Sequence, residues 1–120
     1  MNIFHQRIQP EVLNELKQAE RLEQLDDPKA AFQHLERAHV LGQSSTRWHT
    51  LVHFRMFRWA WAQRDGKEMW GQVMRMIGAL TKTALGWVPR GNTGGSNVSP
   101  FKSMPIPKDL QRILDRNDRR

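Results

Sequence analysis

The sequence contains no cysteine and no tyrosine. The absence of cysteine excludes disulfides, thiolate metal ligands, iron–sulfur clusters and cysteine nucleophiles. Long hydrophobic runs are also missing. No stretch approaches the roughly 20 apolar residues that a membrane-spanning helix needs, and the N-terminal residues lack the basic and apolar segments of a secretory signal. We therefore expect a cytoplasmic protein without a membrane segment, in which histidine, carboxylate, amide or water would bind any metal.

Positive charge is in excess, with 19 lysines and arginines against 12 acidic residues and a formal net charge of +7 over 120 residues. Such a charge favours anionic partners, including nucleic acid. The basic residues are nevertheless scattered along the chain, and no helix-turn-helix, zinc-finger or RNA-binding motif accompanies them. Nucleic-acid binding is therefore only a second alternative, which would use Arg47, Arg55, Arg58, Arg64 and Arg75.

Apolar residues recur at helical spacing in four segments. The predicted helices cover about residues 10–25, 28–42, 45–64 and 67–83. Asp27 and Pro28 are typical of an N-cap and a first helical position, Ser44 or Ser45 can cap the third helix, and Gly42 is typical of a helix end. Short turns make consecutive helices antiparallel. The sequence therefore predicts an all-α fold, a four-helix antiparallel bundle in one domain, residues 1–120.

The third predicted helix has two apolar stripes, which indicates helical neighbours on both sides. One stripe contains His49, Val52, His53, Met56 and Ala60, and the other contains Leu51, Phe54, Phe57 and Trp61. In the fourth helix, the spacing turns Met69, Val73 and Met76 inward and Arg75 outward.

The two helix pairs resemble each other when the chain is shifted by 38 residues, which places Leu13 over Leu51 and Leu35 over Val73. The first pair is tetratricopeptide-like, because Ala31 and Ala38 repeat a small residue seven positions apart. Two such units are fewer than the three that an open array needs. We therefore expect two tetratricopeptide-like hairpins that close into a compact bundle.

Residues 86–107 are rich in glycine and proline and show no helical period. A long segment without secondary structure is usually functional or disordered. Apolar residues such as Trp87, Val88, Val98 and Phe101 are spaced through it, so we expect an extended segment pinned across the bundle. A short helix is predicted at residues 108–115.

Within this segment, "GNTGGSN" could form an anion-binding nest or a lid. The residues concerned are Arg90, Gly91, Asn92, Gly94, Gly95 and Ser96. No strand precedes the motif and no Gly-Lys-Ser/Thr follows it, so it does not match a phosphate-binding loop. Local structural turns are the favoured reading.

Four of the five histidines lie between His34 and His53. Glu36 and His39 are about 60° apart on one helix, and His49 and His53 about 40° apart on the next, so each pair shares a helix face. Both pairs lie one to two turns from the connecting bend, and side chains of an antiparallel hairpin can converge there. The sequence therefore predicts a mononuclear site for a divalent transition metal such as zinc or iron.

Other residues could complete the site or replace it. Glu68, Gln72 and Met56 are possible further contributors, whereas we expect His34 to be exposed. The alternative is that the histidines and the carboxylate only hydrogen-bond across the hairpin.

The chain also resembles a family of small bacterial proteins catalogued as a domain of unknown function. The resemblance covers about residues 11–111 and rests on "LERAHVLGQ", on His49 and His53, on "GQVMR" and on "GNTGGSNVSPFKSMPIPKDL". It implies a bacterial, soluble, helical protein with no assigned activity. The positions that match the family pattern are Glu36, His39, His49, His53, Gln72, Arg75 and 91–96.

The leading hypothesis is a metal-binding helical protein that acts as a carrier, a sensor or a small metalloenzyme. The competing hypothesis is a tetratricopeptide-like interaction module without metal, which would bind a protein partner or form a homodimer. No catalytic residue can be assigned from the sequence.

Overall fold

The computed structural model describes residues 3–84, 94–95 and 103–118, and these contain five α-helices and no strand. The helices are α1 (Ile3–Gln24), α2 (Pro28–Gly42), α3 (Thr46–Gln63), α4 (Gly66–Ala84) and α5 (Lys108–Asp118). The all-α prediction is confirmed within this part of the chain. None of these helices is long and apolar enough to cross a bilayer.

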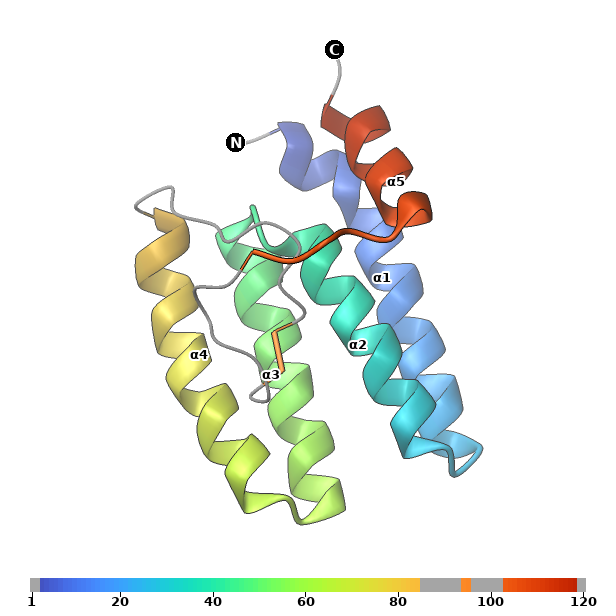
Figure 1. The fold of residues 1–120 in the computed structure, drawn as a ribbon, viewed down its shortest axis with the longest axis vertical. Helices are drawn as coiled ribbons and strands as arrows, with labels where there is room; N and C mark the ends of the chain where they lie inside the picture. The colour runs from blue at the N-terminus through green and yellow to red at the C-terminus, as the bar shows by residue number, and fades with distance from the viewer. Residues whose placement is uncertain (1–2, 85–93, 96–102, 119–120) are drawn as a thin grey trace.

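The four long helices lie side by side in chain order, as Figure 1 shows. The hairpins α1–α2 and α3–α4 each pack closely, and α2 joins them by contacting α3. The expected closure into a four-helix bundle is not seen among the described residues, because α4 contacts α3 and makes no contact with α1. Helix α1 instead packs against α5 as well as α2. The tetratricopeptide-like character of the hairpins stays a prediction.

The apolar core lies between α1, α2, α3 and α5. Its fully buried members include Ile8, Val12, Leu35, Leu41, Val52, Met56 and Leu110. Burying a side chain of this size stabilises the fold by about 1.5–3 kcal/mol. Met56, a possible ligand in the sequence analysis, is therefore a core residue.

The helix starts follow the predicted capping pattern. Asp27 Oδ1 accepts a hydrogen bond from the Ala30 amide at 3.2 Å, and Ser45 Oγ accepts one from the Trp48 amide at 3.4 Å. Gly42 ends α2, but it does so without a positive φ. A Cβ at Gly42 would lie 2.9 Å from Cβ of Trp48, so the missing side chain lets the start of α3 approach the end of α2.

Helix α1 begins at Ile3, whereas the sequence pattern predicts a start near residue 10. Pro10 lies inside the helix, where its ring removes one backbone hydrogen bond. It is on the exposed face, so the freed carbonyl can bond to water. Ile8 is fully buried and extends the Val12 stripe by one turn, which accounts for the longer helix.

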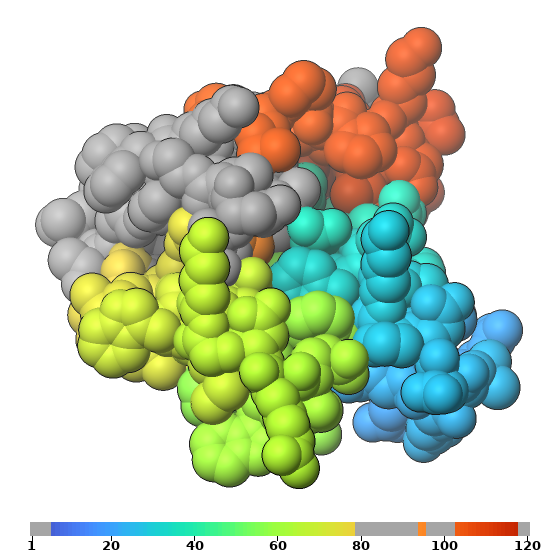
Figure 2. Space-filling view, turned by 60° about the horizontal axis from the view of Figure 1, so that its bottom comes forward, coloured from blue at the N-terminus to red at the C-terminus, as the bar shows by residue number. Residues whose placement is uncertain are grey.

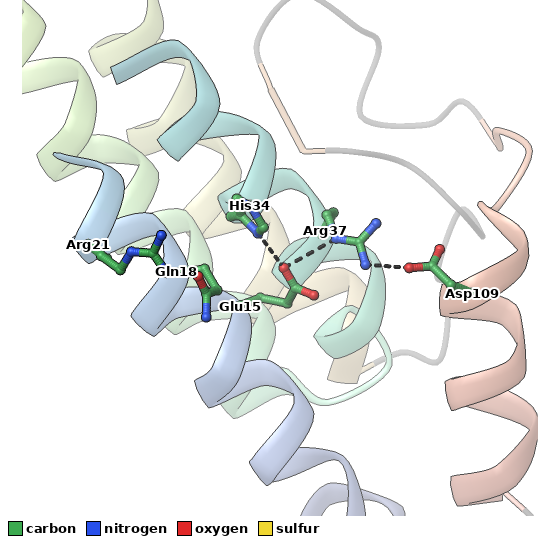
Figure 3. Close-up of polar contacts among 6 residues, drawn as sticks. All are labelled: Glu15, Gln18, Arg21, His34, Arg37 and Asp109. Carbon is green, nitrogen blue, oxygen red and sulfur yellow. Dashed lines mark hydrogen bonds and ion pairs between the residues drawn. The ribbon is translucent and has the colours of Figure 1, made fainter. Parts of the chain in front are cut away.

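Helix α5 is held by a polar network that Figure 3 shows. Glu15 of α1 accepts hydrogen bonds from His34 Nδ1 at 2.7 Å and from Arg37 Nε at 3.2 Å. Arg37 also donates to Asp109 Oδ2 at 2.5 Å. The pKa of the Asp109 carboxyl is lowered, mainly by this hydrogen bond. His34 is thus a half-buried partner of Glu15, and its expected exposure is wrong.

The predicted extended segment lies largely outside the described residues, including Trp87, Val88, Val98 and Phe101. Residues 103–107 are described and have no helical structure, in agreement with the prediction. Ile106 packs against the core, so this end of the segment is pinned as expected. Helix α5 then begins at Lys108, as predicted, and continues to Asp118.

Candidate metal centre

Three histidine rings meet near the turn between α2 and α3. His39 comes from the last turn of α2, and His49 and His53 come from the first two turns of α3. The three residues are only 3%, 6% and 2% exposed, and one ring nitrogen of each lies within 4.8 Å of the other two. His39 Nε2 lies 2.9 Å from His49 Nε2 and 3.1 Å from His53 Nε2. The predicted convergence of these histidines is therefore observed.

Gln72 of α4 determines which nitrogen of His53 carries the proton. The Gln72 amide nitrogen donates to Glu68 Oε2 at 2.5 Å and to the Gly94 carbonyl at 3.0 Å, and both partners can only accept. The amide oxygen therefore faces His53, whose Nδ1 lies 2.6 Å away and must donate. In the neutral ring, Nε2 is then left as a lone-pair donor directed at His39.

The convergence of Nε2 atoms is unfavourable for hydrogen bonding alone. A neutral His39 has at most one proton on Nε2, which can point at His49 or His53 but not at both. A metal cation instead accepts a lone pair from each ring. At a Zn–N distance of about 2.0–2.1 Å, ligand nitrogens are about 3.3–3.4 Å apart in a tetrahedron and about 2.8–3.0 Å apart between neighbouring positions of an octahedron. The two observed separations are close to these values, so the group could hold a metal ion.

Gly94 of the "GNTGGSN" motif lies against His39 on one side of the histidine group. Gly94 has a φ of +87°, and a Cβ at this residue would lie 2.5–2.9 Å from ring atoms of His39. Both Gly94 and Gly95 are buried, and their carbonyls accept hydrogen bonds from Arg75. Only glycine therefore fits at residue 94, because any side chain would overlap the imidazole.

The helical pattern predicts that Arg75 points outward, and this prediction is wrong. Arg75 is half-buried and donates to the Gly94 and Gly95 carbonyls, so α4 holds this segment against the histidines. Burial lowers the pKa of Arg75, while the nearby Glu68 carboxylate opposes this shift. The sequence pattern missed this role because residues 94–95 are distant in the chain.

The carboxylates of Glu36 and Glu68 are close enough to repel each other. Glu36 is half-buried, and its pKa is raised above 4.5, first by burial and then by repulsion from Glu68. It is outside the set of ligand atoms that lie within 4.8 Å of one another, which consists of His39, His49 and His53. Glu36 as a ligand therefore stays a prediction.

The remaining predicted contributors have different positions. Glu68 and Gln72 act together behind His53 as its hydrogen-bonding support. Such a second layer of contacts orients metal-ligating histidines in many proteins. Arg90, Gly91, Asn92 and Ser96 lie outside the described residues, so the anion-nest and lid predictions stay untested for them.

Comparison with known proteins places the chain in a family. The chain has no match among curated proteins or among solved structures. A family model matches residues 6–114, which is most of the chain. The chain therefore belongs to the family described as "Protein of unknown function (DUF3703)".

Proposed function

We propose that the protein binds one divalent transition metal ion through the Nε2 atoms of His39, His49 and His53. The observation that carries this proposal is the approach of His39 Nε2 to both other Nε2 atoms, at 2.9 and 3.1 Å, inside a buried site. Glu36 is the proposed fourth ligand, because it lies one turn before His39 and its carboxylate is disfavoured without a cationic partner.

Zinc or iron is the proposed ion class. Imidazole suits zinc, iron, copper and nickel, and a carboxylate ligand shifts the preference away from soft ions such as copper(I). The low exposure of all three rings and the Gly94 backbone against His39 favour an enclosed ion. An enclosed site is typical of a carrier, a sensor or a structural centre, whereas an enzyme keeps a coordination position open to its substrate.

Metal analysis with matched variants tests this function. The chain is purified without added metal, dialysed against Zn²⁺ or Fe²⁺, and analysed for bound metal per chain. We expect about one ion per chain, and a melting temperature that falls when a chelator removes it. His53→Ala should lose the bound ion, while the matched variant His34→Ala, which removes a histidine bonded to Glu15, should retain it.

Circular dichroism of each variant shows whether it is folded. Loss of metal in a folded His53→Ala chain supports the proposal. If wild type, His53→Ala and His34→Ala bind the same substoichiometric amount of metal, the proposal is wrong. The histidines would then only hydrogen-bond across the hairpin.

A further inference from the structure

The C-terminal half of α3 has one side in the core and another side that is exposed. Trp59 faces α2, where its indole stacks against Phe32 and its Nε1 donates to the Pro28 carbonyl at 2.7 Å. Two positions later, Trp61 is 65% exposed, and Phe54 on the same stripe is 46% exposed. Helices α2 and α4 flank α3 on both sides, as the two stripes predict, but Phe54 and Trp61 of the second stripe stay exposed.

This stripe lines a groove, which we call the α3 groove. It has a volume of about 350 Å³, and its residues are Glu23, Phe54, Arg55, Phe57, Arg58, Trp61 and Ala62. Glu23 belongs to the end of α1, and the other residues belong to α3. In Figure 2, the surface is indented between the C-terminal half of α3 and the α1–α2 turn.

The groove combines aromatic rings with positive charge on one wall. The ring centroids of Phe57 and Trp61 are 6.0 Å apart, the rings are tilted by 54°, and both rings line the groove. Arg55 and Arg58 add two guanidinium groups on the same helix. Large exposed aromatic residues next to arginine are enriched at protein–protein binding sites, because they bury much area at little entropic cost.

We propose that the α3 groove binds an amphipathic peptide segment of a partner protein, with apolar side chains against the rings and carboxylates next to Arg55 and Arg58. The charge of the chain is complementary to such a segment, since its net charge is +7. Apolar anchors at helical spacing would match the stripe of Phe54, Phe57 and Trp61 on α3. This proposal is independent of the metal centre.

A single-stranded nucleic acid is a poorer match to the groove. Its bases need open aromatic faces on which they can stack in succession, together with a basic path for the phosphates. The tilted rings line a groove, and the Glu23 carboxylate on the α1 wall would repel a phosphate chain. A peptide carries separate charged and apolar side chains, so it can keep its carboxylates on the α3 side.

Selection from a random library tests the proposal without a known partner. A phage-displayed library of random 12-residue peptides is selected against the full chain, and binding of the enriched peptides is measured by fluorescence anisotropy. We expect enriched peptides that combine large apolar residues with aspartate or glutamate. Trp61→Ala and Arg58→Glu should each weaken their binding about tenfold or more.

Two matched variants control for general surface effects. Trp70→Ala removes a tryptophan that is 67% exposed on α4, outside the groove, and Arg112→Glu reverses an exposed charge on α5. Both should leave peptide binding within about twofold of wild type. All four positions are exposed, so the variants should keep their folds.

Three results would overturn the proposal. The first is a selection that enriches no acidic, apolar peptides. The second is enriched peptides that bind Trp61→Ala and Arg58→Glu as well as wild type. The third is tight, Trp61-dependent binding of a 12-nucleotide oligo-dT that displaces the peptides, which would assign the groove to nucleic acid.

Discussion

The side-chain oxygen of Gln72 lies 2.6 Å from Nδ1 of His53 and links α4 to the histidine group on α2 and α3. The same amide donates to the Gly94 carbonyl. One side chain therefore sets the tautomer of a candidate ligand and also holds the backbone that covers the site. The proposed metal centre depends on this contact as well as on the ligands themselves.

Replacing Gln72 with methionine should weaken metal binding while the fold is retained. Methionine has a similar volume but cannot accept the proton of His53 Nδ1, and loss of such a supporting contact typically costs 10–100-fold in metal affinity. Competition with a chromogenic chelator measures the Kd for Zn²⁺. Gln18→Met, at a residue that accepts a hydrogen bond from Arg21 on α1, is the control and should leave the Kd unchanged. If the Kd of Gln72→Met for Zn²⁺ equals that of Gln18→Met, Gln72 does not support the site.

Gly94→Ala should destabilise the chain by about 1–3 kcal/mol, because a side chain at a φ of +87° is strained and would overlap the His39 ring. Chemical denaturation measures the free energy of unfolding. Gly66→Ala is the matched control, since a Cβ there meets nothing within 4 Å. That variant should be neutral or slightly more stable. A Gly94→Ala chain as stable as Gly66→Ala would mean that residue 94 does not lie against His39 in solution.

Glu36→Gln should stabilise the metal-free protein at neutral pH and weaken metal binding. Burial and Glu68 raise the pKa of Glu36, so the folded chain binds the proton more tightly than the unfolded chain. Stability from this group is present below its ordinary pKa of about 4.5 and is lost as the pH rises through the folded value. The variant should therefore melt higher than wild type at pH 7, in the presence of a chelator, with the difference shrinking toward pH 4. A lower melting temperature across this range would contradict the raised pKa.

Leu110→Ala should cost about 2–4 kcal/mol of stability, since this α5 residue is fully buried in the core. Asp109→Ala, which removes the ion pair to Arg37 at a half-exposed position, should cost about 1 kcal/mol or less. Urea denaturation of the two variants measures how much each substitution lowers the free energy of unfolding. If the two costs are equal, α5 is held by the ion pair and not by apolar burial.

Much of the fold follows from local patterns in the sequence. The starts of α2, α3 and α5 agree with Asp27, Ser45 and Lys108 because capping and turn residues act over a few positions. Contacts between distant segments were harder to predict. Periodicity could not show that Ile8 would extend α1 past Pro10, or that α5 and not α4 would pack on α1.

In the candidate site, too, local features were predictable and contacts between distant segments were not. Its three histidines were predicted, because His49 and His53 share one helix face and the turn brings His39 opposite them. Gln72 was predicted only as a possible contributor and Arg75 as an outward residue, because their contacts with the Gly94 carbonyl join segments that are about 20 residues apart in the chain. A buried polar residue on an apolar helix face, such as Gln72, is the signal that points to such support.

The most direct test of the account is a long-range ¹H–¹⁵N NMR spectrum of the histidine rings, recorded before and after one equivalent of Zn²⁺ is added. We predict that the rings of His39, His49 and His53 become Nε2-coordinated with a proton on Nδ1, while His34 is unchanged. Spectra in which the Nε2 signals of these three rings do not change when zinc is added, or in which zinc binds through Nδ1, would contradict it.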